Sequence, residues 1–442
     1  MSAESGLRPA EDRLRRRRWL IYGVVAAMYF VSYVHRVAPA VVAVDLMRTF
    51  SITAATLGSM TAIYPYTFVV MALVAGSLVD TAGPRWTLTA GGLAMALGAA
   101  LFGVAPTFPV AFLGRLLVGL GASVVLISWL TLMAEWFPAD RFAVMSGSTL
   151  VVGNLGALVA STPLALLVEG VGWRETFVLI GAVTCMLAGA AAFVVRDRPE
   201  SLGLRPISPR TARATSLPEV LRGIPMVLGN RRTWPPVLAA AGVYATEIAF
   251  LGLWGVPYLT QVYGFDRVRA ASTISMVAVG MIVGSPLIGW LSDRWLVRRR
   301  VPFVGFTAVY AACWLPLALP GWRLESPLLP VLFFLMGVAS SGFVLVWACT
   351  REVNDPGRVG IVVGIVNGPI FLGFALLQWL MGAVLDARWS GLAPGGVRIY
   401  GPDAYEGAFA LCLAVAVAAL ICTAMVTETR CRNVWNAQAV RA

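Results

Sequence analysis

The hydrophobic positions of this chain fall into long unbroken runs rather than into an alternating pattern. A helix that crosses a bilayer core of roughly 30 Å needs roughly 20 apolar residues. Twelve runs meet that requirement, at 20–46, 54–79, 86–105, 108–134, 142–168, 175–195, 236–262, 270–292, 301–320, 327–350, 360–385 and 404–427. The runs are rich in Gly and Ala, as packed membrane helices are, and lack the short alternation of a membrane β-barrel. The pattern therefore predicts an all-α membrane protein with twelve transmembrane helices.

The longest polar stretch separates the first six runs from the last six. It covers 196–235 and is rich in Pro, Ser and Arg. The predicted organisation is a basic cytoplasmic N-terminus at 1–19, a six-helix half at 20–195, a cytoplasmic linker at 196–235, a second six-helix half at 236–427 and a cytoplasmic tail at 428–442.

An internal repeat supports two related halves. Gly76 and Asp80 recur 213 residues later as Gly289 and Asp293. Four further positions recur at an offset of 217 residues: Glu135, Arg141, Gly147 and Gly156 return as Glu352, Arg358, Gly364 and Gly373. A constant offset of this kind indicates two pseudo-symmetric halves.

Composition and charge agree with a membrane protein. Of 442 residues, 59% are hydrophobic and 13% are charged, which is more apolar surface than a soluble fold of this size buries. The net charge of +12 comes entirely from Arg, concentrated in the termini and in alternate loops, so it follows the positive-inside rule and predicts cytoplasmic termini. No nucleic-acid partner is expected. The lack of an Asn-x-Ser/Thr sequon favours a bacterial inner membrane.

The six cysteines show no metal-ligand spacing. We also find no nucleophile and base pairing and no phosphate-binding loop, and there is a single histidine. We therefore expect neither a metal site, nor another cofactor, nor enzymatic activity.

Four short motifs carry a resemblance to a known family. The segment from Gly76 through Asp80 and Gly83 to Arg85 resembles the signature loop between helices 2 and 3 of the major facilitator superfamily. The other three motifs that are similar to this family are Arg115-x-x-x-Gly119-x-Gly121, Gly172-Trp173-Arg174-x-x-Phe177 and the segment Arg196 to Glu200. The resemblance implies transport by alternating access, in a chain that by family default is a monomer.

The resemblance also implies a gating role for charges at the cytoplasmic rim. The residues concerned are Asp80, Arg85, Glu135 and Arg141 in the first half and Asp293, Glu352 and Arg358 in the second. The alternative is that these charges only cap helix ends. The second loop departs from the family pattern, because it lacks the Gly after Asp293 and carries Arg298 to Arg300 instead.

Ionisable side chains within the spans are the candidates for substrate binding, because such groups are costly in a membrane and so indicate function. Arg36, Arg115 and Glu247 are the central candidates. Tyr33 shares the helical face of Arg36, and Trp254 shares that of Glu247. Arg is suited to carboxylate and phosphate groups, so the expected substrate is anionic or zwitterionic. Arg115 has an equally weighted structural alternative.

Two residues are candidates for proton coupling. Glu247 is the one carboxylate clearly within a span, and His35 has a near-neutral reference pKa. A packed structural role is the alternative for His35, since it points away from the face that carries Arg36.

The function predicted is proton-coupled uptake of a small organic acid, amino acid or dipeptide. Helix 1 resembles those of organophosphate and organic-anion carriers. The segments His35 to Pro39 and Phe50 to Ala54 resemble those of intraphagosomal amino-acid transporters and lysosomal dipeptide carriers. An exchanger or efflux carrier of organic anions, or a nontransporting receptor on the same fold, is the alternative.

Overall fold

The computed structural model describes residues 3–71, 74–203, 217–393 and 398–435, and within these ranges the regular structure is entirely helical. The α-helices are α1 (Ala3–Val41), α2 (Ala43–Phe50), α3 (Ala54–Met71), α4 (Ala75–Gly103), α5 (Phe108–Ser123), α6 (Val125–Trp136), α7 (Ala139–Val159), α8 (Thr162–Val171), α9 (Trp173–Val194), α10 (Leu217–Gly229), α11 (Trp234–Ala249), α12 (Gly255–Tyr263), α13 (Arg267–Trp290), α14 (Arg300–Ala318), α15 (Leu329–Ser340), α16 (Leu345–Val353), α17 (Val359–Ala387) and α18 (Pro402–Ala424). Short 3₁₀ segments are η1 (Pro199–Leu202), η2 (Arg231–Thr233), η5 (Ser326–Leu328), η6 (Ser341–Val344) and η7 (Pro356–Arg358), and π-helical segments are η3 (Phe250–Trp254) and η4 (Leu291–Trp295).

In the part of the chain that is described, eleven helical stretches are long and apolar enough to cross a membrane. The predicted span at 54–79 falls on α3 and the start of α4, and residues 72–73 between them lie outside the described ranges. Parts of the predicted linker, at 204–216, and of the predicted tail, at 436–442, also lie outside them. The all-α membrane fold is confirmed, and the division at 196–235 into two six-helix halves stays a prediction.

Several spans are built from more than one helical piece. The predicted span at 236–262 consists of α11, the π-helical η3 and α12. Pro257 lies just after η3, and its ring removes one backbone donor and crowds the carbonyl of Leu253. The regular hydrogen-bond ladder is therefore interrupted there, and a π-helical turn accommodates the break.

The helices form two compact units. Unit 1 comprises Met1–Arg36, Val70–Ala157 and Val168–Ala214. Within it α4 packs along α5 and α9. Glycines let α4 and α5 approach closely, since a Cβ atom at Gly91 would lie 2.8 Å from the carbonyl oxygen of Gly121, and one at Gly98 would lie 2.6 Å from that of Gly114.

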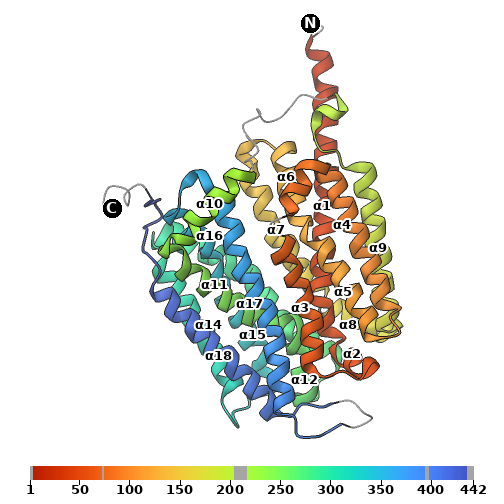
Figure 1. Cartoon of the computed structure of the whole chain (residues 1–442), viewed down its shortest axis with the longest axis vertical. Coiled ribbons are helices and arrows are strands. Elements are labelled where there is room, and N and C mark those ends of the chain that lie inside the picture. The colour runs from red at the N-terminus through yellow and green to blue at the C-terminus, as the bar shows by residue number, and fades with distance from the viewer. Residues whose placement is uncertain (1–2, 72–73, 204–216, 394–397, 436–442) are drawn as a thin grey trace. The chain divides into compact units, whose positions relative to one another are not determined.

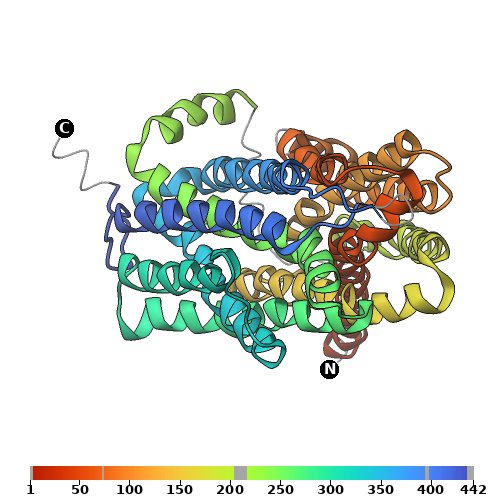
Figure 2. The same ribbon diagram turned by 90° about the horizontal axis from the view of Figure 1, so that it is seen from below.

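Unit 2 comprises Val37–Val69, Leu158–Leu167 and Thr215–Ala442. Its main pairs are α13 with α15, α14 with α18, and α11 with α17. The last two pairs are labelled in Figure 1. Figure 2, turned toward the helix ends, shows α17 and α18 side by side. Unit 2 also holds α2 and α3, which join helices more than two hundred residues farther along the chain.

Candidate functional site

The residues predicted to bind substrate or to couple protons lie in both units. Tyr33, His35, Arg36 and Arg115 belong to unit 1, whereas Glu247 and Trp254 belong to unit 2. The contacts of each group within its own unit indicate what each side chain can do.

Arg36 lies near the end of α1 and is 5% exposed. Its guanidinium carbon is 4.8 Å from the centroid of the Tyr33 ring, a cation–π distance. The Tyr33 hydroxyl is 3.4 Å from that of Tyr29, one turn earlier. Space for the Tyr33 ring comes from Gly153 on α7, because a Cβ atom there would lie 2.8 Å from the ring. The ring thus contacts a buried cation on α1.

Arg115 has a more structural environment than Arg36. It is 2% exposed, and its Nη1 donates a hydrogen bond of 2.8 Å to the backbone carbonyl of His35. This bond links α5 to α1 two residues from Tyr33. The contact favours the structural alternative for Arg115, and its role in substrate binding stays a prediction.

His35 is fully buried, and its Nε2 lies 3.0 Å from the Thr184 hydroxyl on α9. That hydroxyl donates to the carbonyl of Ile180 at 2.7 Å, so it can only accept from the imidazole. Nε2 therefore carries a proton and donates it to Thr184. This arrangement favours a packed histidine that joins α1 to α9, and a coupling role for His35 stays untested.

Glu247 on α11 is fully buried in unit 2. Its Oε1 accepts a hydrogen bond of 2.8 Å from Ser340 on α15, and its Oε2 has no hydrogen-bond partner among the described residues. Next to it in the chain is Thr246, whose hydroxyl lies 2.8 Å from that of Tyr310. A carboxyl group with one donor in an apolar interior is costly to ionise, so this site is suited to hold a proton.

Trp254 ends the π-helical segment η3 and is fully buried. Its indole Nε1 donates to the backbone carbonyl of Gln378 on α17 at 3.2 Å. The same carbonyl would lie 2.6 Å from a Cβ atom at Gly58, so α3 also approaches α17 closely at this point. Trp254 therefore packs between helices, and direct contact with substrate stays a prediction.

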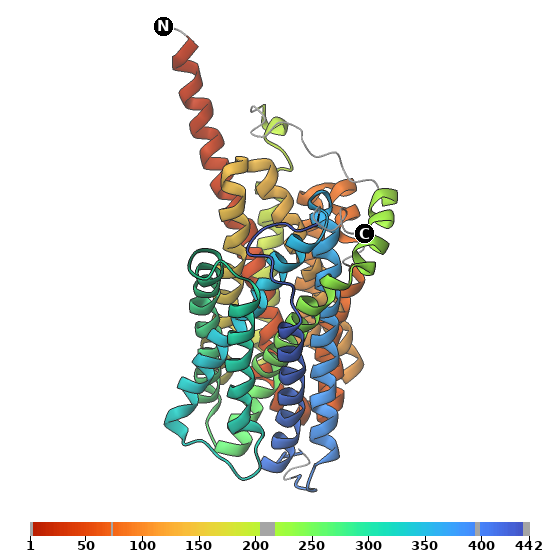
Figure 3. The same cartoon turned by 90° about the vertical axis from the view of Figure 1, so that its left-hand side faces the viewer.

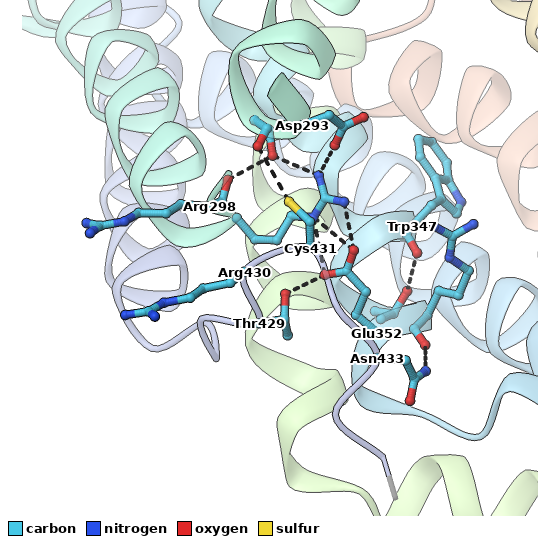
Figure 4. A network of polar contacts seen from close by, with 12 residues as sticks. Asp293, Arg298, Trp347, Glu352, Thr429, Arg430, Cys431 and Asn433 are labelled. Carbon is cyan, nitrogen blue, oxygen red and sulfur yellow. Dashed lines mark hydrogen bonds and ion pairs between the residues drawn. The ribbon is translucent and has the colours of Figure 1, made fainter. Parts of the chain in front are cut away.

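Two of the three predicted gating residues of unit 2, Asp293 and Glu352, contact Arg299, a residue that none of the four motifs contains. Arg299 is 5% exposed and donates to Glu352 through two nitrogens, with Nε 3.0 Å from Oε1 and 3.2 Å from Oε2, and Nη2 2.7 Å from Oε1. Its Nη1 donates to the Ser292 hydroxyl at 2.8 Å and to Asp293. Figure 4 shows Asp293 and Glu352 within one network of polar contacts. Asp293 and Glu352 are thereby joined through Arg299.

Arg358, the predicted partner of this cluster, instead pairs with Asp355 at 3.2 Å. The sequence contained a signal for Arg299, namely the run Arg298 to Arg300 that departs from the family pattern. It did not indicate which Arg turns inward. Burial alone would lower the pKa of Arg299, but the hydrogen bonds to Glu352 and Asp293 raise it above its usual range, so the guanidinium stays charged.

The corresponding charges of unit 1 are arranged differently. The Arg85 side chain donates to the carbonyl of Ala192 at 2.9 Å, and its backbone N–H donates to the Asp197 carboxylate at 2.7 Å. Asp80 is exposed, and Glu135 lies 3.9 Å from Arg198.

Asp197, which accepts a hydrogen bond from the backbone of Arg85, lies within the Arg196 to Glu200 motif but was not among the predicted gating residues. Arg141, at the start of α7, is exposed. A gating role for the unit 1 charges stays a prediction.

Among the described residues no group of three or more His, Cys, Asp or Glu side chains is placed to hold a metal ion.

Similarity to known proteins extends over most of the chain. The model of a family described as Major Facilitator Superfamily matches residues 18–328 and 256–439. The chain is 26% identical over 307 residues to the probable sulfoacetate transporter SauU of Cupriavidus necator, covering 65% of this chain and 70% of that protein. It is 23% identical over 396 residues to the membrane sensor protein UhpC of Salmonella typhimurium, covering 84% and 85% of the two chains.

A solved structure with a similar fold is a bacterial homologue of the human lysosomal transporter Spinster, in an inward-facing and unoccupied conformation. Its TM-score is 0.73 at 16% sequence identity, over 93% of this chain and 95% of that chain. At this identity the likeness concerns the fold alone.

Proposed function

Because the chain belongs to the Major Facilitator Superfamily, whose members are membrane transporters, we propose that it carries out proton-coupled uptake of a small organic anion by alternating access. Membership confirms the resemblance seen in the motifs, and a transporter family agrees with the expectation that the chain is not an enzyme. The substrate class and the coupling ion are the parts that are proposed.

The observation that carries the substrate class is the buried cation on α1. Arg36 is buried within a membrane-spanning helix, with its guanidinium carbon 4.8 Å from the centroid of the Tyr33 ring. A guanidinium can bind a carboxylate, sulfonate or phosphate group through a bidentate contact, which favours an anionic substrate. A relative described as a probable sulfoacetate transporter supports a small organic anion as the substrate.

Glu247 supports proton coupling. In the alternating-access cycle, a buried carboxyl group that meets water on one side and then on the other can take up a proton and release it. Its single described donor, Ser340 at 2.8 Å, can hold the group in either protonation state because a hydroxyl also accepts.

The first experiment is uptake into proteoliposomes with an imposed proton gradient. The labelled pools are sulfonates including sulfoacetate, organic acids, phosphate esters, amino acids and dipeptides. We expect accumulation of one anionic class, and we expect Arg36→Gln to reduce it at least tenfold, because loss of one charge-assisted bidentate contact costs about 1.5 to 3 kcal/mol. Arg48→Gln, an exposed arginine on α2, is the matched control and should transport normally.

Accumulation that is the same in the Arg36→Gln protein and the native protein would refute Arg36 as the anion site. Binding of an anion, seen as a thermal shift, without any flux would instead favour a receptor, a possibility that the similarity to a membrane sensor protein raises.

Glu247→Gln tests the coupling step separately. A glutamine keeps the hydrogen bond with Ser340 but cannot exchange a proton at neutral pH, so we expect gradient-driven accumulation to disappear while exchange of substrate across the membrane continues. The measurement is accumulation with a gradient compared with counterflow without one. Undiminished accumulation in the Glu247→Gln protein would show that protons couple elsewhere or not at all.

A further inference from the structure

The chain does not leave the unit 2 bundle when α18 ends at Ala424. Figure 3 shows the dark blue segment after α18 turning back over the ends of neighbouring helices. The residues with the contacts described below are Glu428–Val434, which we call the tail strap.

The last part of the strap satisfies the open end of α16. The backbone N–H of Val434 donates to the carbonyl of Glu352 at 2.8 Å. The Asn433 amide donates to the carbonyls of Arg351 at 2.9 Å and Asn354 at 3.1 Å. Carbonyls at a helix C-terminus have no partner within the helix, so these bonds hold the strap where α16 ends.

The middle of the strap reaches the charge cluster itself. The Thr429 hydroxyl, 4% exposed, donates to Oε2 of Glu352, whose other oxygen is bound by Arg299. The thiol of Cys431 lies 3.5 Å from the carbonyl of Ser292 in η4. In Figure 4, Thr429 and Cys431 lie beside the contacts that join Glu352 and Asp293. The strap thus completes the coordination of the buried carboxylate at the centre of the cluster.

The beginning of the strap caps a third helix. The Glu428 carboxylate accepts the backbone N–H of Arg299 at 2.9 Å and that of Arg300 at 3.1 Å, at the N-terminus of α14. An acidic side chain is favourable there because it satisfies free N–H groups and meets the positive end of the helix dipole. One short segment therefore contacts η4, the start of α14 and the end of α16.

We infer that the tail strap restrains the Asp293–Arg299–Glu352 cluster, so that the helix ends it joins can separate only after the strap has been released. The restraint on the cluster does not depend on the proposed transport function. The expectation that the strap slows the conformational cycle rests on that function. The start of α14 and the end of α16 share this strap, so they cannot move apart without breaking the bonds from Glu428 or those from Thr429 and Val434.

The first test needs no substrate. Hydrogen exchange is measured by mass spectrometry on the purified full-length native protein and on Thr429→Val, Thr429→Ser and Thr423→Val. Thr423 is a fully buried threonine whose hydroxyl bonds only within α18 in the described structure, so it is a matched control. We expect peptides covering 292–303 and 350–355 to exchange at least fivefold faster in Thr429→Val. Thr429→Ser, which keeps the hydroxyl, and Thr423→Val should match the native protein.

A chain ending after Thr427 is the second variant and should show a larger acceleration than Thr429→Val, whereas a chain ending after Trp435 keeps the strap and should match the native protein. Native-like exchange at 292–303 and 350–355 in the chain that ends after Thr427 would overturn the inference. This outcome would leave the proposed function intact, because anion uptake is measured separately.

The second test measures whether the tail strap slows transport. Once a transported anion has been found, its counterflow exchange should be at least threefold faster in Thr429→Val than in Thr423→Val. Faster amide exchange with unchanged counterflow would overturn the braking role. Failure to find any transported anion would count against the proposed function alone, since the amide measurement still decides whether the strap restrains the cluster.

Discussion

At the scale of single residues, three consecutive arginines show how strongly environment decides a role. Arg298 and Arg300 are exposed, whereas Arg299 between them is buried and holds both Glu352 and Asp293. Replacing Arg299 by Gln would leave the carboxylate of Glu352, 5% exposed, without its counter-charge. We expect this change to destabilise the protein by about 3 kcal/mol, as for other broken buried ion pairs.

The measurement is denaturant-induced unfolding in detergent, followed by tryptophan fluorescence, for Arg299→Gln beside Arg298→Gln. The control changes an exposed charge and should lie within about 0.5 kcal/mol of the native protein. Equal stability of the two variants would mean that Glu352 does not depend on Arg299.

At the scale of elements, the N-terminus of α14 is capped by Glu428, which lies more than a hundred residues farther along the chain. Burial alone would raise the pKa of Glu428, but hydrogen bonds from the backbone N–H groups of Arg299, Arg430 and Arg300, together with the charge of Arg298, lower it below its usual range. A lowered pKa means that the stabilisation is fully present above the ordinary Glu pKa of about 4.3 and is lost as pH falls through the lower value of the folded state.

We therefore expect the native protein to be more stable than Glu428→Gln at pH 6 to 7, and the difference to shrink as pH falls below about 4. Thermal unfolding of both proteins across that range measures the difference. Glu406→Gln, which removes another carboxylate that accepts from a backbone N–H, that of Gly321, is the control and should show its own, separate pH dependence. A difference between native protein and Glu428→Gln that grows on acidification would contradict the capping role.

At the scale of the whole molecule, unit 2 is held together by contacts between distant parts of the chain. Asp386, at the end of α17, accepts the backbone N–H groups of Ala54 at 3.2 Å and Ala55 at 2.8 Å, where α3 begins. Asp45 on α2 pairs with Arg267 at the start of α13 at 2.6 Å. Both contacts join segments that lie far apart in the sequence.

A charge exchange tests the second of these contacts. Asp45→Arg should lower thermal stability by placing two cations together, and Asp45→Arg with Arg267→Asp should restore it, with a coupling free energy of about 1 kcal/mol for a half-buried pair. Asp45→Arg combined with Arg269→Asp, which changes an exposed neighbouring arginine, should show no such rescue. Equal rescue by both combinations would mean that the pair is not specific.

The sequence by itself determined the class of this protein and its candidate ionisable residues. The length of an apolar run is set by the thickness of the bilayer, so the helical membrane fold could be predicted without knowledge of any contact. The cost of a charge in a span similarly singled out Arg36, Arg115 and Glu247, and the structure places all three in buried positions. These properties depend only on residues close together in the chain.

The partners of the charged side chains were decided by the tertiary structure alone. Glu352 is bound by Arg299 rather than by Arg358, the backbone of Arg85 by Asp197, and Arg115 donates to the carbonyl of His35. A charged side chain has many possible partners along the sequence, and the one it takes depends on which helix ends meet in space and which groups they shield from water. For the same reason nothing in the chain's local pattern indicated that Thr429 would complete the coordination of Glu352.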